Sequence, residues 1–182
     1  MSELPFILFG QQHLFALVLS ALTIIYFPLY AKKKLSKDSQ KVIAKTLAVF
    51  LIVHELSRPF YRPYFFGDEL ILSFPLHACH LSAFSIAVYL LVRKKVFFEV
   101  AYYWGLGGGT MALLTPDITR AFPDIEWFPF FMGHGAMIMA IFFSMFCHNT
   151  YPSRHSFRTV SYTHLRAHET LRYLVCRLLL EK

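Results

Sequence analysis

Residues 14–30 of this chain are LFALVLSALTIIYFPLY, a stretch without a single charged side chain. A helix needs about 17 to 25 predominantly apolar residues to cross the hydrocarbon core of a bilayer. Lys32, Lys33 and Lys34 follow almost at once, and basic clusters of this kind mark the cytoplasmic ends of membrane helices. The stretch therefore predicts a transmembrane helix that ends in the cytoplasm.

The composition of the whole chain has the same bias. Hydrophobic residues make up 56% of the 182 positions and charged residues only 16%, against about 25% charged residues in an ordinary soluble domain. This composition excludes a disordered chain and most soluble enzymes. The three cysteines, Cys79, Cys147 and Cys176, have unrelated spacings, which excludes a disulfide framework and a zinc motif.

Four further stretches resemble the first. The five expected spans are residues 14–30, 42–57, 70–92, 96–114 and 128–146. Because these stretches are continuously apolar and do not alternate, they predict an all-α, polytopic transmembrane helix bundle with five spanning helices, and not a barrel. In the fourth span, Gly105 and Gly109 are spaced for close packing against another helix.

The connectors between the spans predict how the helices are oriented. Those after the first, third and fifth spans are basic, whereas the other two carry at least about as much acid as base. By the positive-inside rule, we expect a multi-pass protein with its N-terminus outside. The net charge of +7 then orients helices, and no nucleic-acid partner is expected. Glu99 lies one turn from Arg93–Lys95, which predicts an ion pair at the cytoplasmic surface.

The last residues of the chain differ from the rest. Residues 160–182, VSYTHLRAHETLRYLVCRLLLEK, resemble the translated read-through of a sequencing adapter. We therefore expect residues 1–159 to form a single transmembrane domain that is incomplete at its C-terminus, and residues 160–182 to be a non-native tail. The alternative is an amphipathic C-terminal helix, since four apolar residues of this segment share one helix face. No cleavable signal peptide is expected at the N-terminus.

Several ionisable side chains fall within the expected spans, where each costs at least about 2.5 kcal/mol at the bilayer centre. They are His54 and Glu55 in the second span, His77 and His80 beside Cys79 in the third, and His134 in the fifth. Three helices thus bring polar groups to a similar depth in the outer half of the membrane, where Asp117 caps the fourth span. We expect these groups to line one shared cavity.

Cys79 is the candidate nucleophile of this cavity. On a continuous helix His77 and His80 share nearly one face, whereas Cys79 points away from His77. A base for the thiol would therefore come from another helix, and His134 or His54 lies at a suitable depth. Such a base would favour the reactive thiolate, which burial in an apolar layer disfavours. A small, packed and unreactive cysteine is the alternative.

Three motifs carry a family resemblance. They are FPLHACHLSAF at residues 74–84, AYYWGLGGGTMALLTPD at residues 101–117 and FFMGHG at residues 130–135. They resemble YwaF-like bacterial integral membrane proteins, within the wider transmembrane protein 164 family. The resemblance covers residues 10–150 and implies a multi-pass protein of the bacterial cell membrane with more helices than five.

The resemblance also implies a function. The vertebrate branch of the family is regarded as a phospholipid acyltransferase with an intramembrane cysteine and histidine, which match Cys79 and His134. It implies that Cys79 forms a thioester with an acyl group of a membrane lipid, with His134 as base and then acid. His54, His77, His80 and Asp117 would support the reaction or bind substrate, and no cofactor or metal ion is expected.

Two other functions stay open at this stage. The first is a non-enzymatic membrane carrier or metal-handling protein with a histidine-lined cavity, because imidazole and carboxylate groups are suitable zinc or iron ligands. The second is a purely structural or assembly protein, in which substitutions of these residues would be silent.

Overall fold

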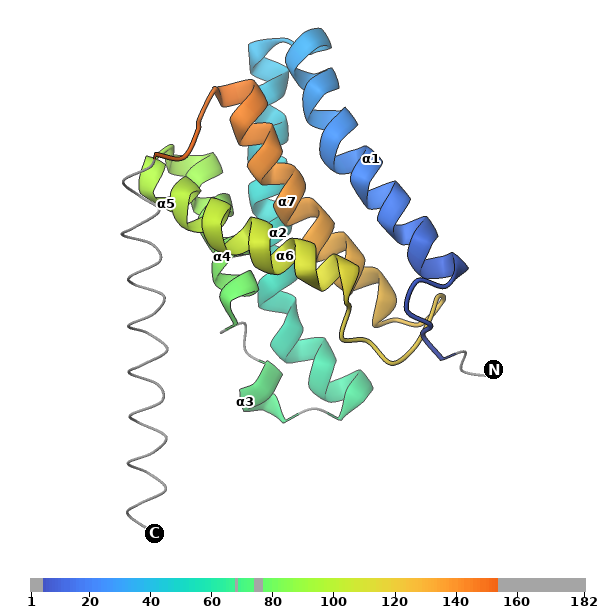
Figure 1. The fold of residues 1–182 in the computed structure, drawn as a ribbon. Helices are drawn as coiled ribbons and strands as arrows, with labels where there is room; N and C mark the ends of the chain where they lie inside the picture. Colours follow the sequence, from blue (N-terminus) through green and yellow to red (C-terminus); the bar gives the residue numbers. More distant parts are fainter. Residues whose placement is uncertain (1–4, 68, 74–76, 154–182) are drawn as a thin grey trace.

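The computed structural model describes residues 5–67, 69–73 and 77–153 of the chain. The regular elements in these ranges are all helices, which confirms the all-α class (Figure 1). In chain order they are α1 (Gln11–Lys34), α2 (Lys37–Phe66), α3 (Leu70–Ser73), α4 (Ala78–Val92), α5 (Lys95–Val100), the π-helical segment η1 (Ala101–Gly105), α6 (Leu106–Leu114) and α7 (Trp127–His148).

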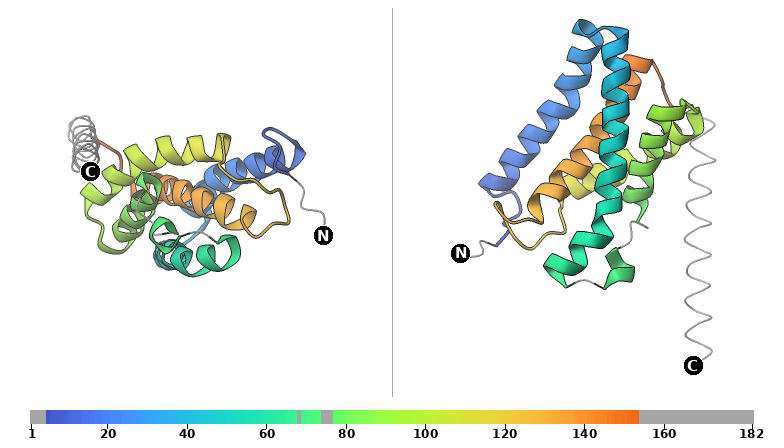
Figure 2. Two further views of the ribbon diagram at one scale, coloured as in Figure 1. Left: turned by 90° about the horizontal axis from the view of Figure 1, so that it is seen from below. Right: turned by 180° about the vertical axis from the view of Figure 1, so that it is seen from behind.

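Helix α7 lies at the centre of the bundle. It packs against α1, α2, α4 and α6, and the further views in Figure 2 show these helices on different sides of it. Its inner side chains, among them Ile141 and Phe143, have no exposed surface. Gly105 and Gly109 of the fourth expected span face α7, since an added Cβ at either would meet Met137. The predicted close packing through these two glycines is confirmed.

Two helices are long and apolar enough to cross a membrane, namely α1 and α7. α1 is mostly uncovered and exposes large apolar side chains such as Phe15, Val18 and Leu22. The expectation of five spans is not supported by the helices in the described ranges. α2 carries charged residues along its length, α4 has only 15 residues, and the fourth stretch is divided among α5, η1 and α6.

The third expected span is not one helix. α3 ends at Ser73 and α4 begins at Ala78, after His77 in an extended conformation (φ −69°, ψ 155°). Pro75 lies between these helices in the sequence, and a proline disfavours the helical conformation of the residue before it. The expectation of one continuous helix is therefore wrong, although the His77 and His80 rings still lie against each other, with 5.7 Å between centroids.

The second expected span extends further than predicted. α2 continues past Ser57, through Pro59 and Pro63, and ends at Phe66. Gly67 then adopts the left-handed conformation (φ 70°), and its N–H donates to the carbonyl of Pro63 at 3.2 Å. Glycine is favoured at such a helix end because it has no Cβ. This extension places two additional turns of α2 beside the polar cluster described below.

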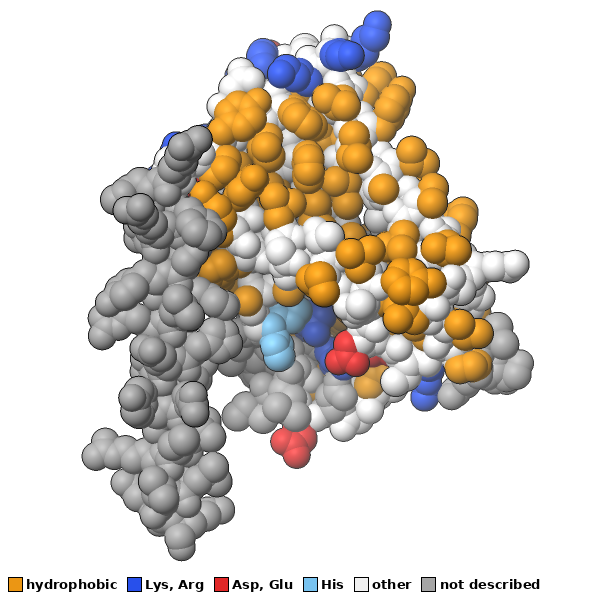
Figure 3. Space-filling model, in the orientation of Figure 1, with side chains coloured by type: hydrophobic (Ala, Val, Ile, Leu, Met, Phe, Trp, Pro, Cys, Tyr) orange, Lys and Arg blue, Asp and Glu red, His pale blue; other side chains and the backbone are white. Residues whose placement is uncertain are grey.

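The lysine-rich turn between α1 and α2 lies at one end of the bundle. Gln40 donates to the carbonyls of Ala31 and Leu35 and so fixes the turn between α1 and α2. Lysine and arginine side chains cluster at this end, while apolar side chains cover much of the face below it (Figure 3). Near the α4–α5 turn, Lys95 Nζ lies 3.6 Å from the Glu99 carboxylate, so the predicted ion pair is confirmed.

Candidate functional site

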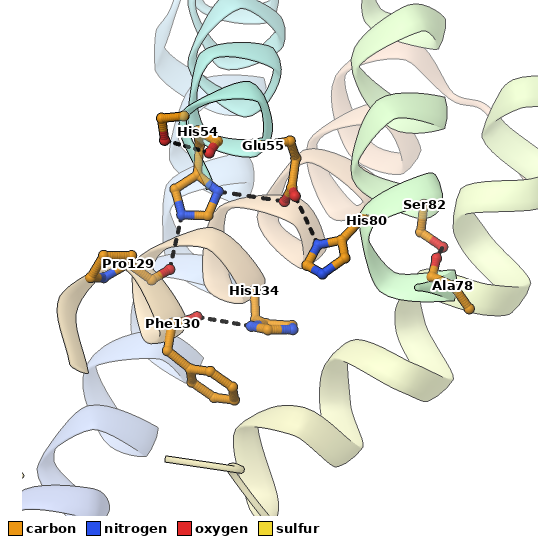
Figure 4. A network of polar contacts seen from close by, with 9 residues as sticks. His54, Glu55, Ala78, His80, Ser82, Pro129, Phe130 and His134 are labelled. Carbon is orange, nitrogen blue, oxygen red and sulfur yellow. Dashed lines mark hydrogen bonds and ion pairs between the residues drawn. The ribbon is translucent and has the colours of Figure 1, made fainter. Parts of the chain in front are cut away.

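A buried carboxylate joins two histidines at the end of the bundle away from the lysine-rich turn. Glu55 Oε1 lies 3.4 Å from Nδ1 of His54, and Glu55 Oε2 lies 2.7 Å from Nδ1 of His80. The side chains of Glu55, His54 and His80 are 6%, 8% and 9% exposed, respectively. Figure 4 shows the carboxylate between the two rings. Because a buried charge requires a partner, the short contact with His80 is the one that accounts for a carboxylate at this depth.

His54 connects the cluster to α7. Its Nε2 lies 3.0 Å from the carbonyl oxygen of Pro129, and since a carbonyl only accepts, Nε2 is the donor. Pro129 is in the first turn of α7, where a proline removes no helical hydrogen bond. The ring passes so close to Gly133 that a Cβ there would lie 2.3 Å from His54 Cε1. Gly133 therefore makes the room that His54 occupies.

A cavity of about 460 Å³ opens beside this cluster. Its lining residues are Arg58, Tyr61, Arg62, Phe66, His77, Cys79, His80, Asp117, Glu126, Phe130 and His134. Five of the six site residues expected from the sequence are in this set. The exception is His54, which instead borders a small adjoining void together with Glu55, Cys79, His80 and His134. His77 and Asp117 are exposed.

Cys79 lies in the first turn of α4 and is half-buried. The positive end of a helix dipole favours a thiolate at this position. α4 has no side-chain cap, and the N–H groups of His80 and Leu81 are both bonded to the carbonyl of His77. Helix geometry leaves the N–H groups of Ala78 and Cys79 without intrahelical acceptors. The first turn thus offers donors beside the thiol.

His134 presents one ring nitrogen to the cavity. Its Nδ1 lies 2.9 Å from the carbonyl oxygen of Phe130, so Nδ1 is the donor and Nε2 of the neutral ring is an acceptor. The ring also packs against Phe130 at a tilt of 42°, with 4.6 Å between centroids. In Figure 4 the rings of His134 and His80 face the same space. An imidazole held in this way is suited to accept a proton.

Comparison with known proteins assigns the chain to a family. The sequence model of the TMEM164 family matches residues 8–165. The chain belongs to the TMEM164 family. It is also 28% identical over 148 residues to an uncharacterized protein of Treponema pallidum (strain Nichols), and the match covers 77% of this chain. The chain covers 58% of that relative's length. No solved structure matches the chain.

The family match confirms the wider resemblance, while the narrower assignment to YwaF-like proteins stays a prediction. The expected non-native tail, residues 160–182, lies outside the described residues. The TMEM164 match ends at residue 165 and so includes the first residues of that segment.

Sequence reasoning overlooked the role of α2 in this member of the TMEM164 family. Glu55, Arg58 and Arg62 recur three and four residues apart, which places them on one face of a helix. The second expected span ends at residue 57, before Pro59 and Pro63, and so leaves out both arginines. Because α2 continues through both prolines, the two arginines reach the cavity wall.

The metal-handling hypothesis has no ligand set in the structure. Among the residues that the structure describes, no group of three or more His, Cys, Asp or Glu side chains is placed to hold a metal ion. In the strongest cluster, each oxygen of Glu55 faces a histidine nitrogen. These two contacts occupy the carboxylate that a metal ion at this cluster would need.

Proposed function

We propose that this TMEM164 family member is an integral membrane protein that transfers acyl groups on phospholipids through Cys79 and His134. The observation that supports this proposal is that both side chains line one cavity although they belong to different helices, α4 and α7. The cavity also contains His80, whose Nδ1 is held by a buried carboxylate. A nucleophile, a candidate base and an oriented imidazole in one concave site are typical of covalent catalysis.

The proposed first step forms a thioester. Cys79 transfers its proton to Nε2 of His134, and its sulfur attacks the carbonyl carbon of a lipid ester. The negative charge that develops on the carbonyl oxygen is stabilised by the N–H groups of Ala78 and Cys79, which need no intrahelical acceptor in the first turn of α4 and are preorganised donors. The tetrahedral intermediate then collapses, the ester C–O bond breaks, and His134 returns the proton to the leaving alcohol.

The second step reverses the first with a different alcohol. A lysolipid hydroxyl gives its proton to Nε2 of His134 and attacks the thioester carbonyl. The C–S bond then breaks to yield the new ester, and the departing Cys79 sulfur takes the proton back from His134. The step needs no oxidant, reductant or cofactor. His80 remains beside the reacting sulfur. Glu55, which also contacts His54, keeps the His80 ring in place.

The proposed topology places this chemistry in the outer half of a bacterial cell membrane. α1 and α7 cross the bilayer, and the apolar faces of α2, α4 and the α5–η1–α6 stretch complete a multi-pass bundle. The lysine-rich turns face the cytoplasm and the N-terminus lies outside. Membrane-impermeant labelling of single cysteines placed at Ser36 and Thr119 tests this topology, because only the Thr119→Cys variant should be labelled in intact cells.

Intact-mass analysis tests the proposed chemistry. Purified protein is incubated with a phospholipid, and a mass increase equal to one acyl chain is expected, reversible by hydroxylamine. The Cys79→Ala variant should lack this adduct, whereas Cys147→Ala, which removes a buried thiol elsewhere in the bundle, should retain it. In His134→Ala the adduct should form about 100-fold more slowly, the lower end of a general base's contribution. An adduct that persists in Cys79→Ala contradicts the proposal.

A further inference from the structure

Arg58 brings a positive charge into the cavity wall. It lies one turn beyond Glu55 on the same face of α2, and it borders both the cavity and the smaller void behind it. Its Nε is buried and has no hydrogen-bond partner in the described part of the chain. A buried donor that belongs to a charged group is costly to leave unpaired, so this arginine is prepared for an acceptor that enters the cavity.

Arg62 lies one turn further along α2, about 6 Å along the helix axis at 1.5 Å per residue. Unlike Arg58, it has partners within the protein. Its guanidinium lies 3.9 Å from the carboxylate of Glu126 and 5.4 Å from the ring centroid of Phe66. The two arginines thus form a short cationic strip along α2, and Arg58 is the one that faces open space.

The acidic groups near the cavity do not neutralise Arg58. Glu55 is engaged by His54 and His80, and Glu126 by Arg62. Asp117 lines the cavity but is exposed to solvent. None of the ion pairs that the structure describes outside its omitted segments includes Arg58. Arg58 therefore remains a cation in the cavity wall whose charge no described ion pair offsets.

We propose that Arg58, assisted by Arg62, binds the phosphate group of a glycerophospholipid and so positions the ester of that lipid against Cys79. A guanidinium presents its donors in a planar fork that matches the oxygens of a phosphate. The choice of a lipid rests on the proposed function, whereas the anion site itself does not. In a glycerophospholipid only a few bonds separate the phosphate from the ester carbonyls, which fits the single helical turn between Arg58 and the Glu55–His80 level.

The test measures binding in a Cys79→Ala background, so that the result does not depend on any acyl transfer. Affinities for phosphatidylglycerol and for diacylglycerol with the same acyl chains are compared by native mass spectrometry in detergent. Arg58→Gln should lose about tenfold or more in affinity for phosphatidylglycerol, the effect of one charge-assisted hydrogen bond, and should bind diacylglycerol unchanged. The affinity of Arg58→Lys for phosphatidylglycerol should fall between those of the parent protein and Arg58→Gln. The matched control is Arg93→Gln, since Arg93 stacks on Tyr89 at the opposite end of α4.

A second arm distinguishes two sources of the phosphate. Competition by inorganic phosphate would support a subsite that also accepts the free anion, and binding of phosphatidylglycerol without such competition would support one that needs the lipid. Equal affinities of the Arg58→Gln and parent proteins for phosphatidylglycerol would overturn the proposal. Should Arg58→Gln fail to fold, the test is made on the parent protein alone. Equal affinities of that protein for phosphatidylglycerol and diacylglycerol would also overturn the proposal. Loss of thioester formation with intact phosphate selectivity would refute only the proposed function.

Discussion

Glu55 on α2 and His80 on α4 form a buried ion-pair contact, with 2.7 Å between Oε2 and Nδ1. Since the carboxylate can only accept, the contact favours a proton on Nδ1 of His80 and directs Nε2 toward the cavity. It also joins the helix that carries the arginines to the helix that carries the thiol. Loss of this contact should therefore both destabilise the bundle and displace His80 within the proposed site.

Replacing Glu55 by glutamine should destabilise the protein substantially. Breaking a buried ion pair by removing one charge costs about 3–5 kcal/mol, because the two histidines lose their common partner. Chemical denaturation in detergent measures this change in the free energy of unfolding. Asp38→Asn is the control, since the Asp38–Lys41 pair is solvent-exposed and such pairs contribute little. A Glu55→Gln protein as stable as Asp38→Asn would show that the network is not structural.

Gly133→Ala should be destabilising although alanine is the better helix former. The added Cβ would lie 2.3 Å from the His54 ring, so the ring must leave its place against Pro129, and overpacking of this kind costs about 1–3 kcal/mol. Gly135→Ala is a matched control two residues along the same helix, because its Cβ would meet only Ser20 Oγ at 3.8 Å. Thermal unfolding of both variants should separate them. Equal melting temperatures would mean that His54 moves freely.

His13→Leu tests a contact between α1 and α6. The backbone N–H of Phe9 donates to His13 Nδ1 at 3.0 Å, and Nε2 donates to the carbonyl of Leu113 at 2.8 Å. The ring is fully buried, and the substitution leaves both backbone partners unsatisfied, which costs about 1–3 kcal/mol each. Thr23→Ala, on an exposed part of the same helix, should unfold at nearly the parent temperature. A His13→Leu protein of parent stability would contradict this role.

The sequence predicted the helical class and the meeting of polar residues because both follow from local properties. Apolar stretches identify helices without knowledge of their neighbours, and ionisable residues within them must find one another. The Gly105 and Gly109 packing was predictable for the same reason, since small residues four positions apart act on one helix face.

The limits of helices were harder to predict because they depend on tertiary contacts. Proline often ends a helix, but α2 continues through Pro59 and Pro63 while the apolar stretch around Pro75 divides into α3 and α4. Because α2 stays helical beyond Pro59, Arg58 lies one turn from Glu55 on the same helix and reaches the cavity wall. Likewise, His54 and Cys79 both fall at a suitable depth in the sequence, yet only the structure shows that His54 turns toward Pro129 and away from the main cavity.

Two adjacent glycines on α6 provide the sharpest test of the thiol's surroundings. A Cβ at Gly108 would lie 3.0 Å from the Cys79 sulfur, whereas one at Gly107 would meet nothing within 4 Å. Gly→Ala raises helix propensity by about 1 kcal/mol at either position, so the two variants differ mainly in crowding at Cys79. About 1 kcal/mol of added crowding corresponds to a roughly fivefold slower reaction.

We therefore expect Gly108→Ala to slow alkylation of Cys79 by a small maleimide about fivefold, and Gly107→Ala to react at the parent rate. The measurement uses a protein in which Cys147 and Cys176 are alanine, so that Cys79 is the remaining thiol, and follows the adduct by intact mass. The same order should hold for thioester formation with phospholipid if Cys79 is the nucleophile. Equal alkylation rates in the two variants would show that the sulfur points away from α6. Thioester formation that is slowed only in Gly107→Ala would show that Cys79 is not the nucleophile.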